Sequence, residues 1–303
     1  MSKVVVFGGS GFLGSHVADE LSIRGFNVVI FDISNSKFIN TDQEMIIGNI
    51  LDREAVKRVV QGSSFVFHFA AIADIQEAKE NPVEAANYNI IGTMNILDAC
   101  REHNVKRFIY SSTIYVYSEH GSFYRSTKQA CELFIENYQK EYGLDFTILR
   151  YGSLYGKRAN NFNFIKNSIR QALIEGKITR KGDGEEIRDY INIIDAAKST
   201  VDSLEDTYRN GYLMITGPQT MKVKELLMMI KEILNNKVEI EYNNVSNDGH
   251  YRITPYSFKP KVAMKISNKE FHDLGQGILD IIYTIYEELI EEGITPKFLR
   301  DVE

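Results

Sequence analysis

The sequence predicts an α/β fold, with a doubly wound parallel sheet of the Rossmann type followed by a smaller α/β lobe. In the first two thirds of the chain, short β-rich segments alternate with segments of helical periodicity, as in such sheets. The strand segments Val4–Phe7 and Val28–Phe31 are almost continuously apolar, which is typical of strands buried on both faces. A glycine-rich turn, Gly8–Gly14, joins the first strand to the first helix. With 303 residues, the chain is long enough to bury a core in both parts.

Residues 1–150 are predicted to form the Rossmann domain. Its strands are expected at Lys3–Phe7, Asn27–Asp32, Glu44–Ile47, Phe65–Phe69, Arg107–Ser111 and Phe146–Arg150. Its helices are expected at Phe12–Arg24, Arg53–Gln61, Pro82–His103 and Tyr124–Tyr142.

After Arg150 the alternation loosens. Helices are expected at Phe162–Glu175, Val223–Leu234 and Ile278–Glu292, and strands at Arg188–Ile194 and Gly211–Thr216. We predict that residues 151–290 form most of the second lobe, that about 188–216 returns to the first domain, and that 291–303 is a frayed tail.

Composition narrows the functional class. The formal net charge is -6 with 44% hydrophobic residues, which argues against a nucleic-acid surface because such surfaces need clustered Lys and Arg. Cys100 and Cys131 show no metal-ligand spacing and no disulfide framework, so we expect no metal site and a reducing cytoplasmic location. No apolar run approaches the roughly 20 residues of a membrane span, and we expect no signal peptide, because the first strand begins without a preceding basic and apolar segment.

The glycine-rich turn predicts a dinucleotide site. Gly8 allows the tight turn, Gly11 lets backbone N–H groups approach a pyrophosphate, and Gly14 lets the helix pack close to the sheet. Phe12 and Leu13 open the helix whose N-terminal N–H groups would bind that pyrophosphate. A glycine-rich turn without a ligand is the alternative.

The end of the second strand predicts which dinucleotide is bound. Asp32 would accept hydrogen bonds from the adenosine ribose and repel a 2′-phosphate, which favours NAD over NADP; a carboxylate that only caps a turn is the alternative. Asn49, followed by Ile50, could bind the adenine edge, and a simple turn asparagine is equally consistent with the sequence.

Tyr124 and Lys128 form the only Tyr-x-x-x-Lys among the 17 tyrosines. This spacing places both side chains on one face of a helix. A tyrosine with a pKa of about 10 is a poor base at neutral pH. A nearby ammonium and a positive nicotinamide ring favour the phenolate, so we expect the pKa of Tyr124 to fall toward neutrality.

Several further motifs occur in an order that resembles the extended short-chain dehydrogenase/reductase family, specifically its nucleotide-sugar epimerase and dehydratase branch. The resemblance covers roughly residues 3 to 290. Besides the glycine turn and the Tyr–Lys pair, the motifs are Phe67–Ala71, Asn89–Thr93, Tyr110–Tyr117, Leu149–Tyr151, Tyr155–Gly156, Gly182–Gly184 and Arg188–Tyr190.

The resemblance implies roles for individual residues. Tyr124, Lys128 and Thr113 would be catalytic, with Thr113 hydrogen-bonding the same substrate oxygen as Tyr124. The remaining cofactor contacts would come from Ala70, Ala71, Ser111 and Tyr151. The substrate contacts would come from Thr113, Ser153, Arg188, which resembles the diphosphate-binding arginine, and Arg252, for which a solvated surface arginine is the alternative. The family also implies a homodimer through Pro82–His103 and Tyr124–Tyr142, and Leu133, Phe134 and Tyr138 add an apolar stripe to the second helix.

Three departures from the family pattern narrow the activity. The segment Ser118–Phe123 is shorter than in related sequences, which predicts a more open sugar end of the site. Ile114 and Tyr115 stand where 4,6-dehydratases carry an acidic pair, which argues against a dehydratase. Ser153 stands where epimerases usually carry an asparagine.

The sequence therefore predicts NAD-dependent oxidation at C4 of a nucleotide-diphosphate sugar. A 4-epimerase is the first hypothesis. A net 4-dehydrogenase of a larger sugar, such as a nucleotide-linked heptose, is the second. A non-catalytic NAD-sensing protein is the remote third, because such proteins typically lose the Tyr or the Lys.

Overall fold

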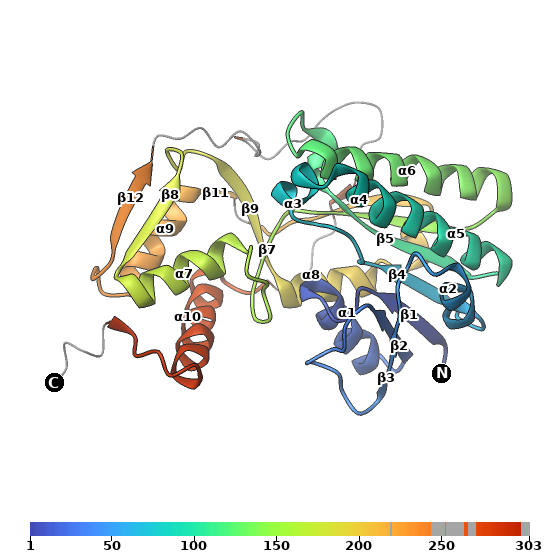
Figure 1. Cartoon of the computed structure of the whole chain (residues 1–303), viewed down its shortest axis with the longest axis horizontal. Helices are drawn as coiled ribbons and strands as arrows, with labels where there is room; N and C mark the ends of the chain where they lie inside the picture. Colours follow the sequence, from blue (N-terminus) through green and yellow to red (C-terminus); the bar gives the residue numbers. More distant parts are fainter. Residues whose placement is uncertain (219, 244–251, 253–263, 266–270, 298–303) are drawn as a thin grey trace. The chain divides into compact units, whose positions relative to one another are not determined.

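A parallel sheet lies at the centre of the first of two units that the chain forms (Figure 1). The computed structural model describes all residues except 219, 244–251, 253–263, 266–270 and 298–303. The first unit comprises 1–151, 196–215 and 255–267, and the second comprises 152–195, 216–254 and 268–303. That one unit binds the cofactor and the other the substrate stays a prediction.

The sheet of the first unit has eight parallel strands in the order β13-β10-β6-β5-β4-β1-β2-β3. The strand order reverses between β1 and β4, the point at which ligands bind in doubly wound sheets. The strands are β1 Lys3–Phe7, β2 Asn27–Asp32, β3 Gln43–Ile47, β4 Phe65–His68, β5 Arg107–Thr113, β6 Phe146–Tyr151, β10 Gly211–Ile215 and β13 Met264–Lys265. The predicted fold class is confirmed.

Helices cover both faces of this sheet. On one face, α2, α5 and α6 bury an apolar core that includes Phe7, Phe31 and Phe108. On the other lie α1 and α8 (Figure 1). Arg24, which directly follows α1, donates to Asp202 of α8 at 2.6 Å. The helical elements are α1 Phe12–Ile23, α2 Arg53–Val60, α3 Ile75–Glu80, α4 Pro82–Ala86, η1 Asn87–Ile91, α5 Gly92–Glu102, η2 Ile114–Tyr117, α6 Ser122–Tyr142, α8 Ile193–Asp202 and η3 Asp206–Tyr208.

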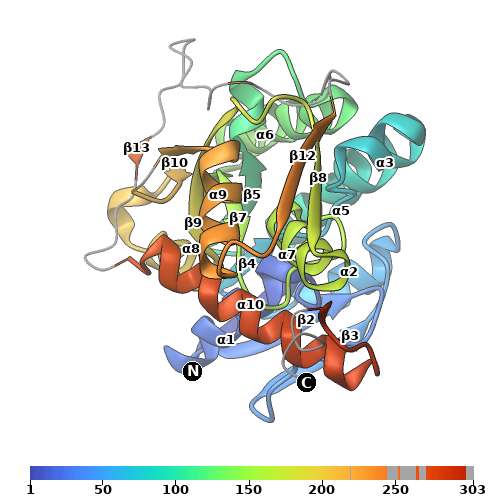
Figure 2. The same ribbon diagram turned by 90° about the vertical axis from the view of Figure 1, so that its left-hand side faces the viewer.

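The second unit packs three helices around a core of its own (Figure 2). Its helices are α7 Phe164–Glu175, α9 Val223–Ile233 and α10 Leu274–Glu291. One small sheet contains β7 Ser153–Tyr155, β9 Ile187–Asn192 and β11 Thr220–Lys222, and the other pairs β8 Lys177–Lys181 with β12 Glu239–Asn243. The predicted tail lies partly outside the described residues.

Two expected elements differ in kind from the structure, and α10 begins at Leu274, four residues before the expected Ile278. The predicted single helix Pro82–His103 is interrupted by the π-helical turn η1, because the buried Asn89 amide turns inward to bond Ile72 and Thr127. The predicted strand Arg188–Ile194 ends at Asn192, whose side chain accepts the N–H of Ile194 and starts α8.

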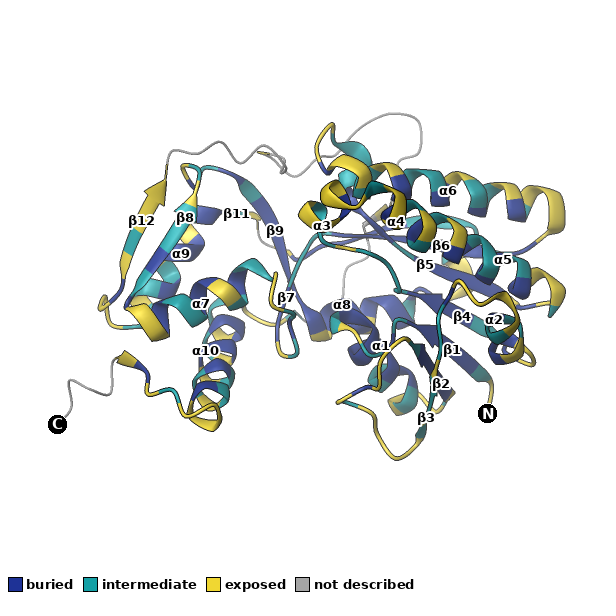
Figure 3. Cartoon of the chain, viewed as in Figure 1, coloured by how far each residue is buried: buried dark blue, intermediate teal, exposed yellow. Residues whose placement is uncertain are grey.

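The burial pattern separates the sheet from its surroundings. The inner strands β1, β2, β4, β5 and β6 are buried along most of their length, whereas the edge strand β3 and the outer faces of the helices are exposed or half-buried (Figure 3). Cys100 and Cys131 are free and buried. No helix in the described part of the chain is long and apolar enough to cross a membrane.

The apolar stripe predicted on α6 is only partly on the surface. Leu133 is exposed, but Phe134 packs against the core and Tyr138 is buried, donating to Asp98 at 2.9 Å. Two of the three residues thus pack within their own chain, and the homodimer stays a prediction.

Candidate functional site

The glycine turn has the geometry that a bound pyrophosphate requires. Gly8 has a φ of 77°, and a Cβ there would strike the backbone of Ala70 at the end of β4. A Cβ on Gly14 would strike the carbonyl of Gly8, so α1 packs directly on the turn. Helix α1 begins after Gly11 without a side-chain cap and without an acidic residue in its first turn. Its first N–H groups therefore suit an anion such as the pyrophosphate of NAD.

Asp32 lies beside this turn. Its carboxylate accepts the N–H of Ser10 at 3.0 Å and that of Ser34 at 3.3 Å. The carboxylate therefore shapes the loop, as the capping alternative requires, and also places a negative charge next to the phosphate-binding turn.

The two residues predicted to contact adenine, Asn49 and Ile50, follow β3 and make contacts with other residues of the chain. Asn49 accepts the N–H of Leu51 at 2.9 Å, the bond of a simple turn asparagine. Ile50 is buried, and its side chain fills the space that a Cβ at Gly92 would need. Their contacts with adenine stay predictions.

The structure brings together the three predicted catalytic residues. Thr113 ends β5, Tyr124 lies in the first turn of α6, and Lys128 follows one turn later. The Thr113 hydroxyl and the Tyr124 phenol are hydrogen-bonded. Lys128 donates to the carbonyl of Ser111 at 2.8 Å, and its Nζ lies 5.8 Å from the centre of the Tyr124 ring.

Burial shifts the pKa values of Tyr124 and Lys128. Burial raises the pKa of Tyr124 to about 12, although the hydrogen bond from Thr113 lowers this pKa. It lowers the pKa of Lys128 to about 8, against the opposing charges of Cys131 and Glu132. In the protein alone the pKa of Tyr124 is thus raised, because burial penalises the phenolate and the ammonium together. The expectation that Lys128 and a bound nicotinamide ring together bring the pKa of Tyr124 toward neutrality stays a prediction.

Tyr151 lies beside Thr113 in the sheet, on the neighbouring strand β6. It is buried, and its hydroxyl is hydrogen-bonded to Thr200 of α8 at 2.6 Å. A role of Tyr151 toward the cofactor stays a prediction, as it does for the half-buried Ala70, Ala71 and Ser111.

The other predicted substrate residues lie in the second unit. Arg188 is buried in β9 and donates to the carbonyl of Ile187 at 2.9 Å. The N–H of Ile187 in turn donates to the carbonyl of Arg252 at 2.6 Å, so the two arginines lie on adjacent segments. The Arg252 side chain is exposed and pairs with Asp183 at 3.3 Å, as its surface alternative requires. Ser153 is half-buried in β7, next to Tyr190 of β9.

Two features of the structure were missed from the sequence. In the first unit, Glu132 and Arg150 form a buried ion pair next to Lys128; the spacing of Glu132, four residues after Lys128, was an available signal. In the second unit, His272 bonds the buried Asp195 carboxylate at 2.8 Å. A cavity of about 220 Å³ lies beside this pair, lined also by Tyr155, Tyr190 and Phe271.

A Rossmann-type domain that carries this glycine turn and a Tyr–Lys pair beside a threonine defines an NAD-dependent enzyme. A sequence profile described as the NAD dependent epimerase/dehydratase family matches residues 4–211, more than half of the chain. The protein belongs to this family, and its cofactor is NAD.

Individual relatives are similar over most of their length. The chain is 28% identical over 280 residues to the UDP-glucose 4-epimerase of Rhizobium leguminosarum bv. trifolii, across 79% of this chain and 84% of the relative. It is 28% identical over 303 residues to the UDP-N-acetyl-alpha-D-glucosaminuronate decarboxylase of Bacillus cytotoxicus, across 89% and 92%. The UDP-N-acetylglucosamine 4-epimerase from Methanobrevibacter ruminantium M1, solved with UDP-N-acetylmuramic acid, superposes with a TM-score of 0.83 at 26% identity, across 95% and 99%.

Proposed function

We propose that the protein is a nucleotide-diphosphate-sugar 4-epimerase that works through a 4-keto sugar. The observation that carries this proposal is the hydrogen bond between Thr113 and Tyr124 beside Lys128. The similarity to two UDP-sugar 4-epimerases supports a nucleotide-linked sugar as the substrate and C4 as the carbon that is oxidised.

The chain's own residues handle the proton. Tyr124 takes the proton of the C4 hydroxyl, either directly or through the Thr113 hydroxyl, which hydrogen-bonds the same substrate oxygen. Lys128 provides a positive charge close to the phenol ring, which favours the phenolate. Bound NAD supplies the hydride acceptor and a second positive charge, which offsets the burial that raises the pKa of Tyr124.

Substrate recognition is proposed to rest on the second unit. Arg188 would bind the diphosphate through charge-assisted hydrogen bonds, and Ser153 and Arg252 would add weaker contacts. Binding energy from the phosphates, remote from the reacting carbon, would then position C4 for reaction.

The short segment before α6 is compatible with both candidate reactions. Arg125 of α6 donates to the carbonyl of Ser118 at 2.6 Å, and Glu119 and His120 are exposed. A more open sugar end would allow a 4-epimerase to present the opposite face of the keto sugar, and it would equally admit the larger sugar of the alternative 4-dehydrogenase.

Product analysis tests the proposal. The protein is incubated with NAD and, in separate reactions, UDP-glucose, UDP-N-acetylglucosamine or UDP-glucuronate, and the products are identified by NMR spectroscopy. We expect the C4 diastereomer of one of these sugars with no net formation of NADH, and no product from the Tyr124→Phe variant.

Other products would point to a different reaction. A keto sugar formed together with NADH would identify a net dehydrogenase and contradict the proposal. Loss of CO₂ from UDP-glucuronate would identify a decarboxylase, as named for the Bacillus cytotoxicus relative, because a carboxylate β to a C4 ketone is readily lost.

A further inference from the structure

A buried ion pair lies next to Lys128, one of the three proposed catalytic residues. Glu132 follows Lys128 by one turn of α6, and Arg150 lies near the end of β6; their side chains are 8% and 3% exposed. Arg150 binds both carboxylate oxygens, with Nε at 3.0 Å and Nη2 at 2.6 Å. Replacing such a pair by apolar residues is often neutral or stabilising, whereas removing one partner leaves a buried charge. Stability alone is therefore a weak reason for its presence.

The pair holds the chain on both sides of Thr113. On one side, the Ser112 hydroxyl donates to Glu132 at 2.5 Å. On the other, Arg150 donates to the Tyr117 hydroxyl, and its guanidinium lies 4.6 Å from the centre of the Tyr117 ring. Because Thr113 lies between Ser112 and Tyr117 in the chain, these contacts restrict where its hydroxyl can lie.

Helix α6 holds the same segment with two further side chains. Gln129 donates to the carbonyl of Val116 at 2.9 Å, and Arg125 to that of Ser118 at 2.6 Å. The helix that carries Tyr124 and Lys128 is therefore linked to the segment after Thr113 by Arg125 and Gln129, as well as through the ion pair.

We propose that Glu132 and Arg150 are positioning residues, which fix Thr113 against Tyr124 and place a compensating negative charge next to Lys128. The inference rests on the proposed catalytic roles of these three residues. Its two parts, the charge and the position, are tested separately.

The charge is tested at Lys128, whose neighbours come from several elements. The charged or titratable groups that act on it are Cys131, Glu132 and Tyr124 of α6, Tyr110 of β5 and His68 of β4, with Arg150 of β6 behind Glu132. In Glu132→Gln the buried Arg150 charge loses its counter-ion, which disfavours the Lys128 ammonium. In Arg150→Met the Glu132 carboxylate is unopposed, which favours the ammonium. A purely structural pair would shift the Lys128 titration in the same direction in both variants.

NMR spectroscopy of lysine labelled at ¹³Cε measures this titration, with the Lys128 signal assigned by its loss in Lys128→Met. We expect the midpoint to fall by about a pH unit or more in Glu132→Gln and to rise in Arg150→Met. Midpoints that move in the same direction, or do not move, would overturn the electrostatic part of the proposal.

The positional part is tested with two matched hydroxyl deletions, because Glu132→Gln can also impair folding. The rings of Tyr117 and Tyr212 lie 4.6 and 4.7 Å from the Arg150 guanidinium. The Tyr117 hydroxyl bonds Arg150, and the Tyr212 hydroxyl bonds Glu136. Only Tyr117 belongs to the segment that follows Thr113, so Tyr212→Phe is the control.

We expect Tyr117→Phe to shift the Thr113 methyl signal and to lower kcat about tenfold with little change in KM, while Tyr212→Phe does neither. An unchanged Thr113 signal in Tyr117→Phe, or equal effects in both variants, would overturn the proposal. The NMR measurements need no substrate. If they give the expected shifts while the nucleotide sugars are not converted, the result contradicts the proposed function and leaves the positioning intact.

Discussion

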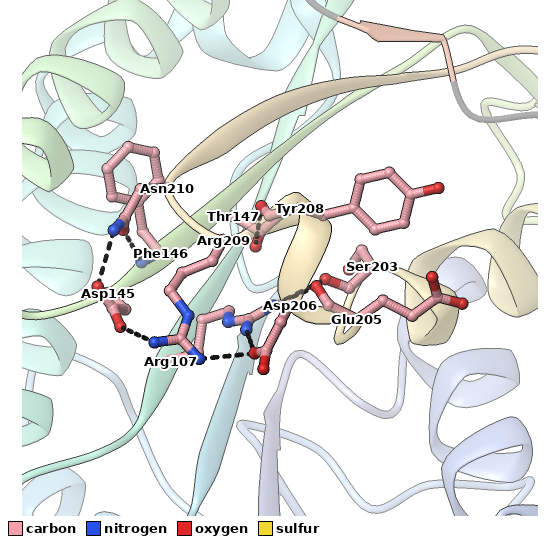
Figure 4. Close-up of polar contacts among 10 residues, drawn as sticks. All are labelled: Arg107, Asp145, Phe146, Thr147, Ser203, Glu205, Asp206, Tyr208, Arg209 and Asn210. Atoms are coloured by element: carbon pink, nitrogen blue, oxygen red, sulfur yellow. Dashed lines mark hydrogen bonds and ion pairs between the residues drawn. The ribbon is translucent and has the colours of Figure 1, made fainter.

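Two arginine-centred networks occupy opposite ends of the same parallel sheet. Arg150 lies near the carboxyl end of β6 and binds the buried Glu132. Arg107 is the first residue of β5, at the amino end, and is equally buried; its polar contacts are drawn in Figure 4. Its guanidinium donates to the carbonyls of Ser203 at 3.1 Å and Glu205 at 3.0 Å, and to Asp206 at 2.9 Å.

The two networks differ in what satisfies the buried charge. Arg150 depends on a carboxylate that is 8% exposed, whereas the carboxylate of Asp206 is 80% exposed and two backbone carbonyls complete the Arg107 site. The Arg107 contacts fix the segment before β10 to the sheet. At the carboxyl end, the buried Lys128 and Tyr124 are held in environments that disfavour their charged forms. The amino end therefore contributes mainly stability, and the carboxyl end retains groups that cost stability.

The largest effect on activity is expected for Tyr124→Phe. Loss of the phenol removes the proposed proton acceptor, so kcat should fall by roughly 10³-fold, within the range of general acid–base catalysis. NAD affinity, measured by calorimetry, should change little. A variant with a near-normal rate would place the proton transfer on another residue.

Lys128→Met is expected to stabilise the protein at neutral pH. Burial lowers the folded-state pKa of Lys128 to about 8, against about 10.4 in the unfolded chain. Below about pH 8 the folded protein therefore holds a disfavoured charge, at a cost of up to about 3 kcal/mol. Between about pH 8 and 10.4 the unfolded state binds more protons, so the stability of the unaltered protein rises with pH and this cost disappears.

Urea unfolding of both proteins at pH 7 and pH 10.5 checks this expectation. Lys128→Met should be the more stable protein at pH 7, with the difference close to zero at pH 10.5. A difference independent of pH would show that Lys128 contributes through packing, and the contrast between the two ends of the sheet would weaken.

Arg107→Met is expected to destabilise the protein without affecting catalysis. The change leaves the carbonyls of Ser203 and Glu205 without this donor, at a cost of about 2 kcal/mol. Urea unfolding measures the loss, and kcat should be unchanged because the residue begins its strand, at the end of the sheet opposite Thr113. A fall in kcat under conditions in which the variant is fully folded would contradict the proposal that the amino end of the sheet contributes to stability and not to catalysis.

The main elements of the fold were accessible from the sequence because buried parallel strands are short apolar runs. Strands such as β1 and β2 have the predicted bounds. The interruption at η1 was not predictable, because it depends on Asn89 bonding Ile72 and Thr127, which lie 17 and 38 residues away in the chain. The strand predicted through Ile194 failed because an apolar run does not distinguish the end of a strand from the start of a buried helix.

The candidate site was predictable where it depends on local spacing. The four-residue interval places Lys128 over the Tyr124 ring, and the end of β5 supplies Thr113. The upward shift in the pKa of Tyr124 in the protein alone was not predictable, because it depends on how deeply tertiary packing buries the phenol. The pairing of Glu132 with Arg150, 18 residues apart, and of Arg107 with Asp206, 99 residues apart, likewise appears only in the fold.

Asp32→Ala tests a charge at the carboxyl end that acts on the cofactor. Removal of the carboxylate beside the glycine turn should narrow the preference for NAD over NADP about tenfold or more. Asp32→Asn is the matched control, since its amide oxygen can still accept the N–H of Ser10. The two variants should behave alike if the charge sets the preference. A preference lost only in the alanine variant would assign it to the shape of the loop. Affinities for both cofactors, measured by titration calorimetry, distinguish these outcomes.

The smallest effect is expected for Asp206→Asn. The carboxylate is 80% exposed, and exposed ion pairs contribute little to stability. Arg107 keeps its two carbonyl acceptors, and Arg209 keeps Asp145 at 3.5 Å. The urea midpoint should therefore be almost unchanged at both low and high salt.

Glu132→Gln makes the same kind of change at the other end of the sheet, but leaves a buried arginine without its counter-ion and should destabilise the protein by about 3 kcal/mol or more. If Asp206→Asn lowers the midpoint as much as Arg107→Met does, the amino end depends on its ion pair after all. The two networks would then differ in position but not in kind.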